Sequence, residues 1–328
     1  MQIRRHWACA ALALATLATG LIATVAPAPS ATADATYYPS LPNGFRSVGY
    51  LTSGAGTVSS IQFSKLTHVN YAFVHPNADG TLQAVPNPSK LSSLVSSGHS
   101  KGVKVLLAAG GWNNGDDSAF EALAASSSRR TTFVNALVGL VNQYGLDGID
   151  MDWEYPDPGT SASNFATLMQ QLSSALHSKG KLLTAAVTAR ATTAEGVPTA
   201  VFGYVDFLNI MAYDSGTPHA NYQWSIDAAN MWKARGLPAG KTVLGVPFYS
   251  RPGQKSYAEL IAIDPAYAWE DCVQVSGTWE CYNGIPTIRK KTKWAMANAG
   301  GVMYWQLAQD TTDSTSLVNA IYQVAITG

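Results

Sequence analysis

The sequence predicts an α/β protein built as a single-domain (β/α)8 TIM barrel, and three observations lead to that prediction. Short apolar segments of strand composition alternate with amphipathic helical patterns, which is typical of a parallel sheet with helical crossovers. There are eight such segments, the number that closes this barrel. Acidic and aromatic residues gather at the segment ends, where barrel sites lie. The predicted strands are residues 47–51, 68–74, 104–110, 148–155, 182–187, 207–213, 242–249 and 301–306.

Helical patterns fill most of the intervals between these strands. Residues 164–177 place Phe165, Leu168, Leu172 and Leu176 on one stripe, which is the period of a helix with one buried face. Further helices are expected at 120–144, in two pieces divided near 126–128, and at 226–235, 287–298 and 316–326, whereas 192–203 is only weakly helical. Glycines occupy the expected helix ends, namely Gly180, Gly236 and Gly300.

Residues 1–35 have the composition of an export signal. Arg4 and Arg5 give a positive start, an apolar Ala- and Leu-rich run covers 10–25, and a small-x-small cleavage site ends at Ala35. A membrane anchor is the less favoured alternative because the apolar run is short and interrupted. The Arg pair leaves the twin-arginine route open, although its flanking residues match that signal poorly. We therefore expect a secreted, extracellular protein.

The rest of the chain is expected to form one domain. About 290 residues suit either one large barrel or two modest domains. Neither a Gly/Ser or Pro/Thr linker nor an internal repeat is visible, so one domain is the economical interpretation. We expect a lead-in at 36–45 and the barrel domain over 46–328.

The charge balance argues against several classes of partner. Without the signal, 19 basic residues face 20 acidic ones, which argues against a nucleic-acid or anionic-membrane partner. The histidines are scattered, and neither an HExxH motif nor a GxSxG nucleophile elbow occurs. We expect no metal, no cofactor and a monomer.

Two cysteines remain after removal of the signal. Cys272 and Cys281 are placed symmetrically about Ser276 and Gly277, a two-residue hairpin turn pair. Cross-strand cysteines in a secreted chain are expected to be oxidised. The sequence therefore predicts a Cys272–Cys281 disulfide.

The run at 146–156, LDGIDMDWEYP, carries the most specific signal for chemistry. On a strand, its alternation places Asp150, Asp152 and Glu154 on one face and large apolar residues on the other. An ordinary half-exposed strand is the alternative interpretation of such alternation. Three neighbouring carboxyls cannot all ionise freely, so at least one pKa should rise, as a general acid near neutral pH requires.

At this point the chain resembles the glycoside hydrolase family 18 chitinases. Their signature, Asp-x-x-Asp-x-Asp-x-Glu on the fourth strand of a TIM barrel, is matched by Asp147, Asp150, Asp152 and Glu154. Asp147 is out of phase with the other three, so we expect it to have a structural role at the strand start. The resemblance implies chitin or chitooligosaccharides as the substrate.

Aromatic residues dominate the other strand ends, where they could be core or could stack on sugar rings. The resemblance implies the second role, with Trp305 as the floor beneath the cleaved sugar. The family's Tyr-Gly-Arg appears here as Tyr249-Ser250-Arg251, a departure that weakens the assignment of Arg251. The candidate substrate-binding residues are Tyr50, Phe73, Trp112, Tyr155, Met211, Asp214, Arg251 and Trp305.

The usual glycosidase mechanisms need two carboxyls across the bond, but Asp152 and Glu154 share one strand face. Asp214 is the best candidate for a second carboxylate; otherwise the substrate's 2-acetamido oxygen must attack, with net retention. The resemblance favours this substrate-assisted route. It makes Glu154 the general acid and then base, Asp152 the group that orients the acetamido N–H, Asp150 its proton-sharing partner and Tyr213 a donor to the acetamido oxygen.

Two alternatives to a chitinase stay open. One is an endo-β-N-acetylglucosaminidase cutting the chitobiose core of N-glycans, and the other is a non-hydrolytic chitin-binding lectin. The lectin is disfavoured because such relatives typically lose the acid that Glu154 provides. The segment 252–286 is too short for a large insertion domain, so we expect an open cleft and endo-acting cleavage.

Overall fold

The computed structural model describes residues 40–42 and 44–328. The predicted export signal at 1–35 lies outside the described residues, as does part of the predicted lead-in at 36–45.

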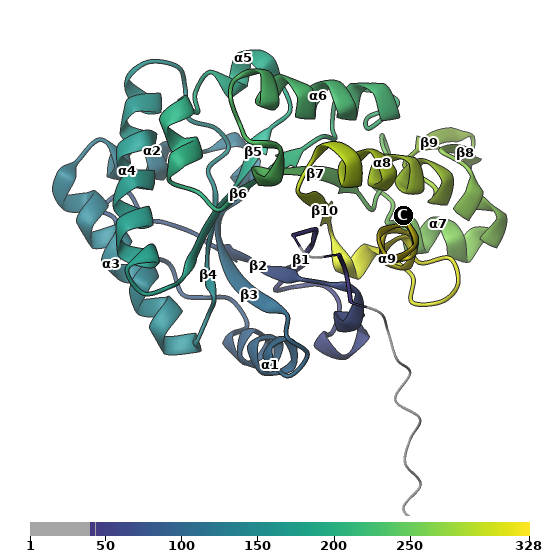
Figure 1. Cartoon of the computed structure of the whole chain (residues 1–328), viewed down its shortest axis with the longest axis horizontal. Coiled ribbons are helices and arrows are strands. Elements are labelled where there is room, and N and C mark those ends of the chain that lie inside the picture. Colours follow the sequence, from purple (N-terminus) through teal and green to yellow (C-terminus); the bar gives the residue numbers. More distant parts are fainter. Residues whose placement is uncertain (1–39, 43) are drawn as a thin grey trace, which may run out of the picture. The chain divides into compact units, whose positions relative to one another are not determined.

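Eight parallel strands close into a barrel in the order β1-β10-β7-β6-β5-β4-β3-β2 (Figure 1). The barrel closes where β1 pairs with β10, with Arg46 opposite Gly301 and Gly49 opposite Tyr304. The predicted TIM barrel is thereby confirmed. Its strands are β1 (Arg46–Thr52), β2 (His68–Val74), β3 (Lys104–Gly110), β4 (Gly148–Asp152), β5 (Leu182–Thr188), β6 (Phe207–Met211), β7 (Thr242–Pro247) and β10 (Gly301–Trp305).

Several strands end earlier than predicted at their carboxyl ends, and β4 shows why. It stops at Asp152 rather than at residue 155 because its neighbour β3 turns away at Gly110 and Gly111, both with positive φ. The last rung pairs Gly110 with Asp152, so the backbone of Trp153 has no strand beside it. Glu154 therefore belongs to the loop that follows β4.

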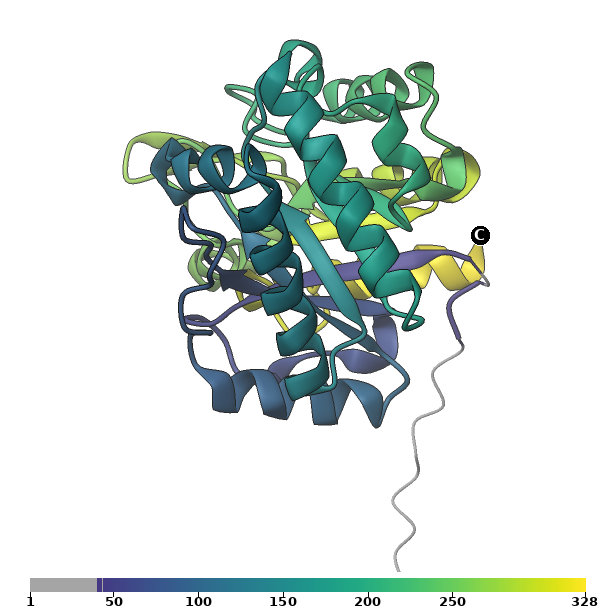
Figure 2. The same ribbon diagram turned by 90° about the vertical axis from the view of Figure 1, so that its left-hand side faces the viewer.

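Helices cover the outside of the barrel, as Figure 2 shows from the side. The predicted division near 126–128 is confirmed, since α2 ends at Ala124 and α3 begins at Ser127. The helices are α1 (Pro88–His99), α2 (Ser118–Ala124), α3 (Ser127–Tyr144), α4 (Thr160–His177), α5 (Ala191–Ala194), α6 (Tyr222–Ala234), α7 (Tyr257–Ile263), α8 (Ile285–Asn298) and α9 (Leu317–Thr327).

Two of these helices, α1 and α7, were not predicted from the sequence. Helix α1 is rich in serine, which has modest helix propensity, but Asn87 caps its N-terminus and Pro88 fits its first turn. Helix α7 is short and begins with a capping box formed by Ser256 and Glu259. Capping and packing therefore stabilise helices that the apolar pattern alone does not reveal.

The two faces of β4 lie in different environments, as its alternation predicts. Ile149, Met151 and Trp153 point outward into the main hydrophobic core between the barrel and its helices. Asp150 and Asp152 lie on the other face and are buried. A smaller apolar cluster fills the barrel interior beside them.

A small hairpin follows α7 on the segment between β7 and α8. Strands β8 (Cys272–Val275) and β9 (Thr278–Cys281) are antiparallel, with Cys272 directly opposite Cys281. Ser276 and Gly277 both have positive φ, as the predicted two-residue turn requires. The predicted disulfide is present.

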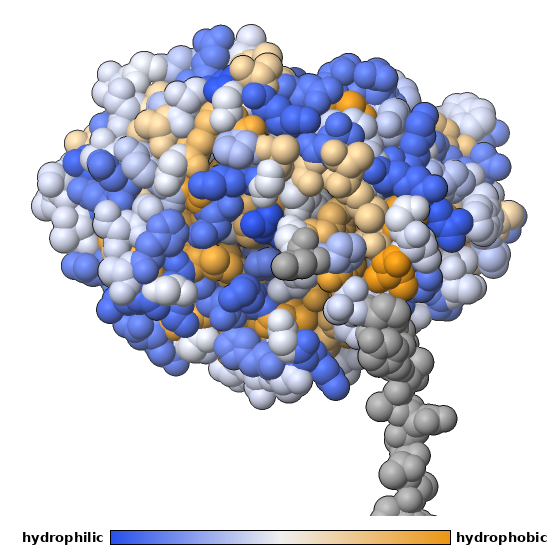
Figure 3. All heavy atoms as spheres, in the orientation of Figure 1, coloured by the Kyte–Doolittle hydropathy of each residue, from blue (hydrophilic) through white to orange (hydrophobic). Residues whose placement is uncertain are grey.

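The face shown in Figure 3 is mostly hydrophilic, with apolar side chains interspersed among polar ones. Within the described residues, no helix has the length and apolar character needed to span a bilayer.

Candidate active site

The deepest carboxylate of the site is Asp150, which is fully buried inside the barrel. It accepts hydrogen bonds from the hydroxyls of Tyr50 on β1 and Thr184 on β5. The amide of Asn209 on β6 donates a third bond at 3.1 Å. Burial raises the pKa of Asp150, and these hydrogen bonds partly offset that effect. Side chains from three other strands thus fix this carboxyl.

Asp152 lies above Asp150 on the same strand and is 3% exposed. Burial, followed by the charges of Glu154 and Asp150, raises its pKa well above the usual value. Its Oδ1 is buried and has no hydrogen-bond partner among the described residues. A buried acceptor without a partner is costly, so this oxygen is ready to accept a hydrogen bond from a bound ligand.

Glu154 is the outermost of the three carboxyls and lies in the loop after β4. Burial raises its pKa to about 7; a hydrogen bond from Tyr155 opposes the shift and the charge of Asp214 adds to it. The carboxyl is therefore partly protonated at neutral pH and can donate its proton. Sequence analysis predicted a raised pKa within this group of three, and all three are raised.

The backbone beside these carboxyls requires glycine. Gly111 donates its N–H to the carbonyl oxygen of Asp152 at 2.8 Å. A Cβ on Gly110 would lie 2.1 Å from that oxygen, and one on Gly111 would lie 2.7 Å from the ring of Phe73. The glycine pair lets β3 approach the carboxylate strand closely.

Three predicted aromatic residues form one group at the barrel mouth. The rings of Phe73 and Trp305 are stacked, with centroids 5.5 Å apart and planes 18° apart. The ring centroids of Tyr50 and Trp305 are 5.5 Å apart. Tyr50 is only 1% exposed, and its hydroxyl donates a hydrogen bond to Asp150 deeper in the barrel. Tyr50 therefore lies under the floor of the site, where it supports Trp305. Trp112 stands apart from this group and is 59% exposed.

Tyr213 and Asp214 follow β6, which lies two strands from β4 on the side away from β3. Burial and nearby acidic groups, including Asp152 and Glu154, raise the pKa of the Tyr213 hydroxyl, which therefore remains a hydrogen-bond donor. Met211, the last residue of β6, is 9% exposed and packs in the interior cluster.

Asp214 is held by two side chains, Arg251 and His219, which together we call the clamp. Its two carboxylate oxygens accept hydrogen bonds from Nε and Nη2 of Arg251, both at 2.8 Å. Nδ1 of the buried His219 lies 3.2 Å from Oδ1. These bonds outweigh the effect of burial and hold the pKa of Asp214 well below its usual value. Asp214 is therefore a fixed anion, and each of its oxygens already accepts a hydrogen bond from Arg251.

With this geometry in place, comparison with known proteins identifies the family. The family model described as "Glycosyl hydrolases family 18" matches residues 46–310, which is most of the chain. The chain belongs to glycosyl hydrolase family 18. The family match and the names of its relatives confirm the prediction of a chitinase-type enzyme at the family level.

The relatives of this family 18 chain come from several organisms. "Chitinase 1" of Aphanocladium album is 27% identical, and the match covers 79% of each chain. A "chitinase-like effector" of Moniliophthora roreri is 32% identical over 74% of this chain and 70% of its own. The class V chitinase of Arabidopsis thaliana is 32% identical over 58% of each chain. A GH18 chitinase structure from Flavobacterium johnsoniae superposes with a TM-score of 0.75 at 28% identity, covering 86% and 94% of the two chains.

The family 18 barrel also contains polar residues that sequence reasoning missed. Thr184 and Asn209 bond Asp150, and Asn70 on β2 is fully buried without a hydrogen bond to either amide atom among the described residues. His219, one of the scattered histidines of the sequence, contacts Asp214. A polar residue in the middle of an apolar strand, as in the β2 and β6 sequences, is the signal that could have revealed the asparagines.

A cavity of about 280 Å³ opens beside Glu154. It lies between the loops that follow β2 and β3, and Glu154 is the one member of the carboxyl group that lines it. Its lining is polar and includes His75, Gln83, Asn113, Asp116 and Asp117.

Asp147, the first acidic residue of the motif, is located before β4 rather than at its carboxyl end. Its Oδ2 accepts hydrogen bonds from His99 Nε2 and from the backbone N–H of Val105, each at 2.7 Å. It joins α1, β3 and the start of β4, which agrees with the structural role expected from its phase.

Proposed function

We propose that the protein is a secreted chitinase that hydrolyses β-1,4 bonds between N-acetylglucosamine units with retention of configuration. The observation that carries the proposal is the state of the carboxyls around the site. Glu154 has a pKa raised to about 7 and lies above a buried aspartate pair. The one acidic group facing it from β6, Asp214, has its oxygens bonded to Arg251. The nucleophile then comes from the substrate.

In the first step, Glu154 donates its proton to the glycosidic oxygen while the bond to the anomeric carbon breaks. The acetamido oxygen of the same sugar bonds to that carbon and gives an oxazolinium ion. Asp152 accepts the acetamido N–H through its unpartnered Oδ1 and stabilises the positive charge. Tyr213 donates a hydrogen bond to the acetamido oxygen and thereby orients it.

In the second step, water attacks the anomeric carbon from the side that the leaving group has left. The Glu154 carboxylate takes a proton from this water, and the oxazolinium ring opens to restore the acetamido group. Asp150 shares a proton with Asp152 while the charge at the site changes. Two displacements at one carbon give net retention.

The sugar-binding surface is formed by the aromatic group. Trp305, stacked on Phe73, provides an apolar platform for the sugar at the cleaved bond, and the exposed Trp112 offers another ring farther out. Arg251 and Asp214 shape the opposite wall together with Met211, and Tyr155 lies next to the acid. The cavity beside Glu154 accommodates sugar units beyond the cleaved bond.

An endo-acting mode is part of the proposal. Between β7 and α8 the described chain carries only α7, a short 3-10 helix and the disulfide hairpin, rather than a large subdomain. This supports an open cleft that accepts internal bonds. Secretion is supported by the sequence of residues 1–35.

A direct test compares two substrates with the same enzyme. We expect the N-acetylglucosamine hexamer to be cut into shorter oligomers, while a high-mannose glycopeptide stays intact by mass spectrometry. Glu154→Gln serves as the background control for both substrates. Release of the glycan from the glycopeptide without cleavage of the hexamer would favour the endo-β-N-acetylglucosaminidase alternative. Binding of the hexamer without turnover would favour the lectin.

A further inference from the structure

The disulfide hairpin lies against the residue that clamps Asp214. The backbone of Cys281 and that of Arg251 bond each other in both directions, N–H to carbonyl oxygen at 2.9 and 2.8 Å. The side chain of Arg251 makes the two bonds to Asp214. The disulfide-bonded residue and the active-site ion pair are therefore one hydrogen-bonded step apart.

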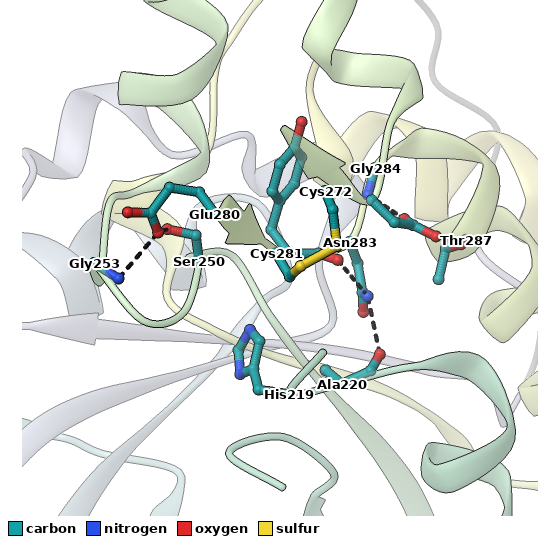
Figure 4. Close-up of a disulfide and its surroundings, with 12 residues drawn as sticks. His219, Ala220, Ser250, Gly253, Cys272, Glu280, Cys281, Asn283, Gly284 and Thr287 are labelled. Atoms are coloured by element: carbon teal, nitrogen blue, oxygen red, sulfur yellow. Dashed lines mark hydrogen bonds between the residues drawn. A yellow bond between two sulfur atoms is a disulfide. The ribbon is translucent and has the colours of Figure 1, made fainter. Parts of the chain in front are cut away.

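A buried glutamate strengthens this attachment. Glu280, next to Cys281 on β9, is 2% exposed and accepts hydrogen bonds from the Ser250 hydroxyl at 2.7 Å and the Gly253 N–H at 3.0 Å (Figure 4). A Cβ on Gly253 would lie 2.0 Å from Glu280 Oε1, so a larger residue there would displace the glutamate carboxylate. The hairpin thus holds the chain on both sides of Arg251.

The residues just after the hairpin hold the segment that carries His219, the second residue of the clamp. The amide of Asn283 donates to the carbonyl oxygen of Ala220 at 2.9 Å (Figure 4). The buried Lys291 donates to that same oxygen and to Asn283 Oδ1, each at 2.7 Å. Ala220 directly follows His219, whose ring contacts Asp214.

These contacts form a closed circuit. It runs from Asp214 through Arg251 to Cys281, then through Asn283 and Ala220 to His219 and back to Asp214. Both groups that hold the Asp214 carboxylate are thus anchored to one short segment, 281–283, whose first residue is fixed by the disulfide.

From this circuit we infer that the Cys272–Cys281 hairpin is a positioning element for the Tyr213–Asp214 wall of the active site. It holds Arg251 and His219 on Asp214, and so fixes the neighbouring Tyr213 at the place where the acetamido group binds. The inference rests on the proposed function, because Tyr213 is the residue whose position matters for turnover.

A double-mutant cycle tests this inference. Four proteins are compared: the parent, Cys272→Ala/Cys281→Ala, Arg251→Ala, and the combination, with kcat/KM measured on the N-acetylglucosamine hexamer. We expect loss of the disulfide to lower kcat/KM about tenfold in the parent. In the Arg251→Ala background the same change should cost less than about twofold, because the link that it acts through is already broken.

Equal losses in the two backgrounds would overturn the inference, since a disulfide that only stabilises the fold would act the same with or without Arg251. Gln274→Ala, an exposed change on the same hairpin, is the matched control and should leave kcat/KM unchanged. If the cysteine variant fails to fold, Glu280→Ala enters the cycle with the same criterion. A parent enzyme inactive on the hexamer would instead contradict the proposed function.

Discussion

An aspartate lies at each end of β4, Asp147 just before it and Asp152 at its last residue, and the two differ in their hydrogen bonding. Asp147, before the strand, has an oxygen that accepts hydrogen bonds from His99 and from the Val105 N–H. Asp152, at the far end, is buried with one oxygen unpartnered and lies between two other acids. One aspartate is placed to join elements, whereas the other retains an unused acceptor.

This difference separates structure from chemistry within one motif. A buried polar group without a partner destabilises the folded protein, so it persists where a ligand or a reaction uses it. A satisfied carboxylate contributes to stability and has no acceptor capacity aimed at a substrate. Substitutions at the two ends of β4 should therefore affect different measurements.

The largest expected effect is at Glu154. Glu154→Gln removes the proton donor but keeps the size of the side chain, so kcat on the hexamer should fall about 10³-fold or more. Binding of the hexamer, measured by calorimetry, should change little. Asp157→Asn, at an exposed carboxylate three residues away, is the matched control and should remain active. A Glu154→Gln variant that keeps a tenth of the parent turnover would refute the assignment.

The next largest effect is expected at Asp152. Asp152→Asn keeps an acceptor oxygen but cannot ionise or share a proton with Asp150, so the oxazolinium ion loses the negative charge that would form beside it. We expect kcat to fall about 10²-fold with the fold intact by circular dichroism. Unchanged kcat would mean that ionisation of Asp152 has no role in the reaction.

The pH dependence of kcat/KM should report the raised pKa of Glu154. Glu154 must be protonated to act as an acid, so kcat/KM should fall about tenfold per pH unit above about 7. Because the negative charge of Asp214 helps to raise this pKa, Asp214→Asn should shift the falling limb to lower pH. A limb that stays in place would show that another group sets it.

The same carboxyl has a predictable effect on stability. Its folded-state pKa is raised, so the protonated form favours the folded state at low pH. That contribution is lost as the pH rises from the unfolded value of 4.5 through about 7. Glu154→Gln should therefore reduce the fall in the melting temperature over this interval.

The smallest effect on activity is expected at Asp147. Asp147→Ala leaves the Val105 N–H without its partner, so the free energy of unfolding should fall by about 1–3 kcal/mol. The change should appear as a lower melting temperature, while kcat per folded molecule stays at the parent value. His99→Ala, which removes only a partly exposed partner, should cost less. A large loss of kcat in Asp147→Ala would contradict the assignment of a purely structural role to Asp147.

The fold could be predicted from the sequence because each barrel strand is an apolar segment bounded by turn residues. The carboxyl ends of the strands could not, because they depend on where a neighbouring strand turns away, as β3 does beside Asp152. Helices α1 and α7 were missed because caps and packing, rather than a strong apolar stripe, define them.

The carboxylates of the site could be found because they follow one another along a single strand. Their supports could not, because Thr184 and Asn209 are far from Asp150 in sequence and only the closed barrel brings them together. Tyr50 was predicted as a sugar platform, but the structure buries it beneath Trp305. Its position in the middle of β1, rather than at the strand end, accounts for this.

The most direct test of the central claim follows the anomeric form of the first products by proton NMR. The account predicts that the N-acetylglucosamine hexamer releases the β-anomer before mutarotation, and that a fully deacetylated oligomer of the same length is not cleaved. Initial release of the α-anomer, or equally fast cleavage of the deacetylated oligomer, would contradict it.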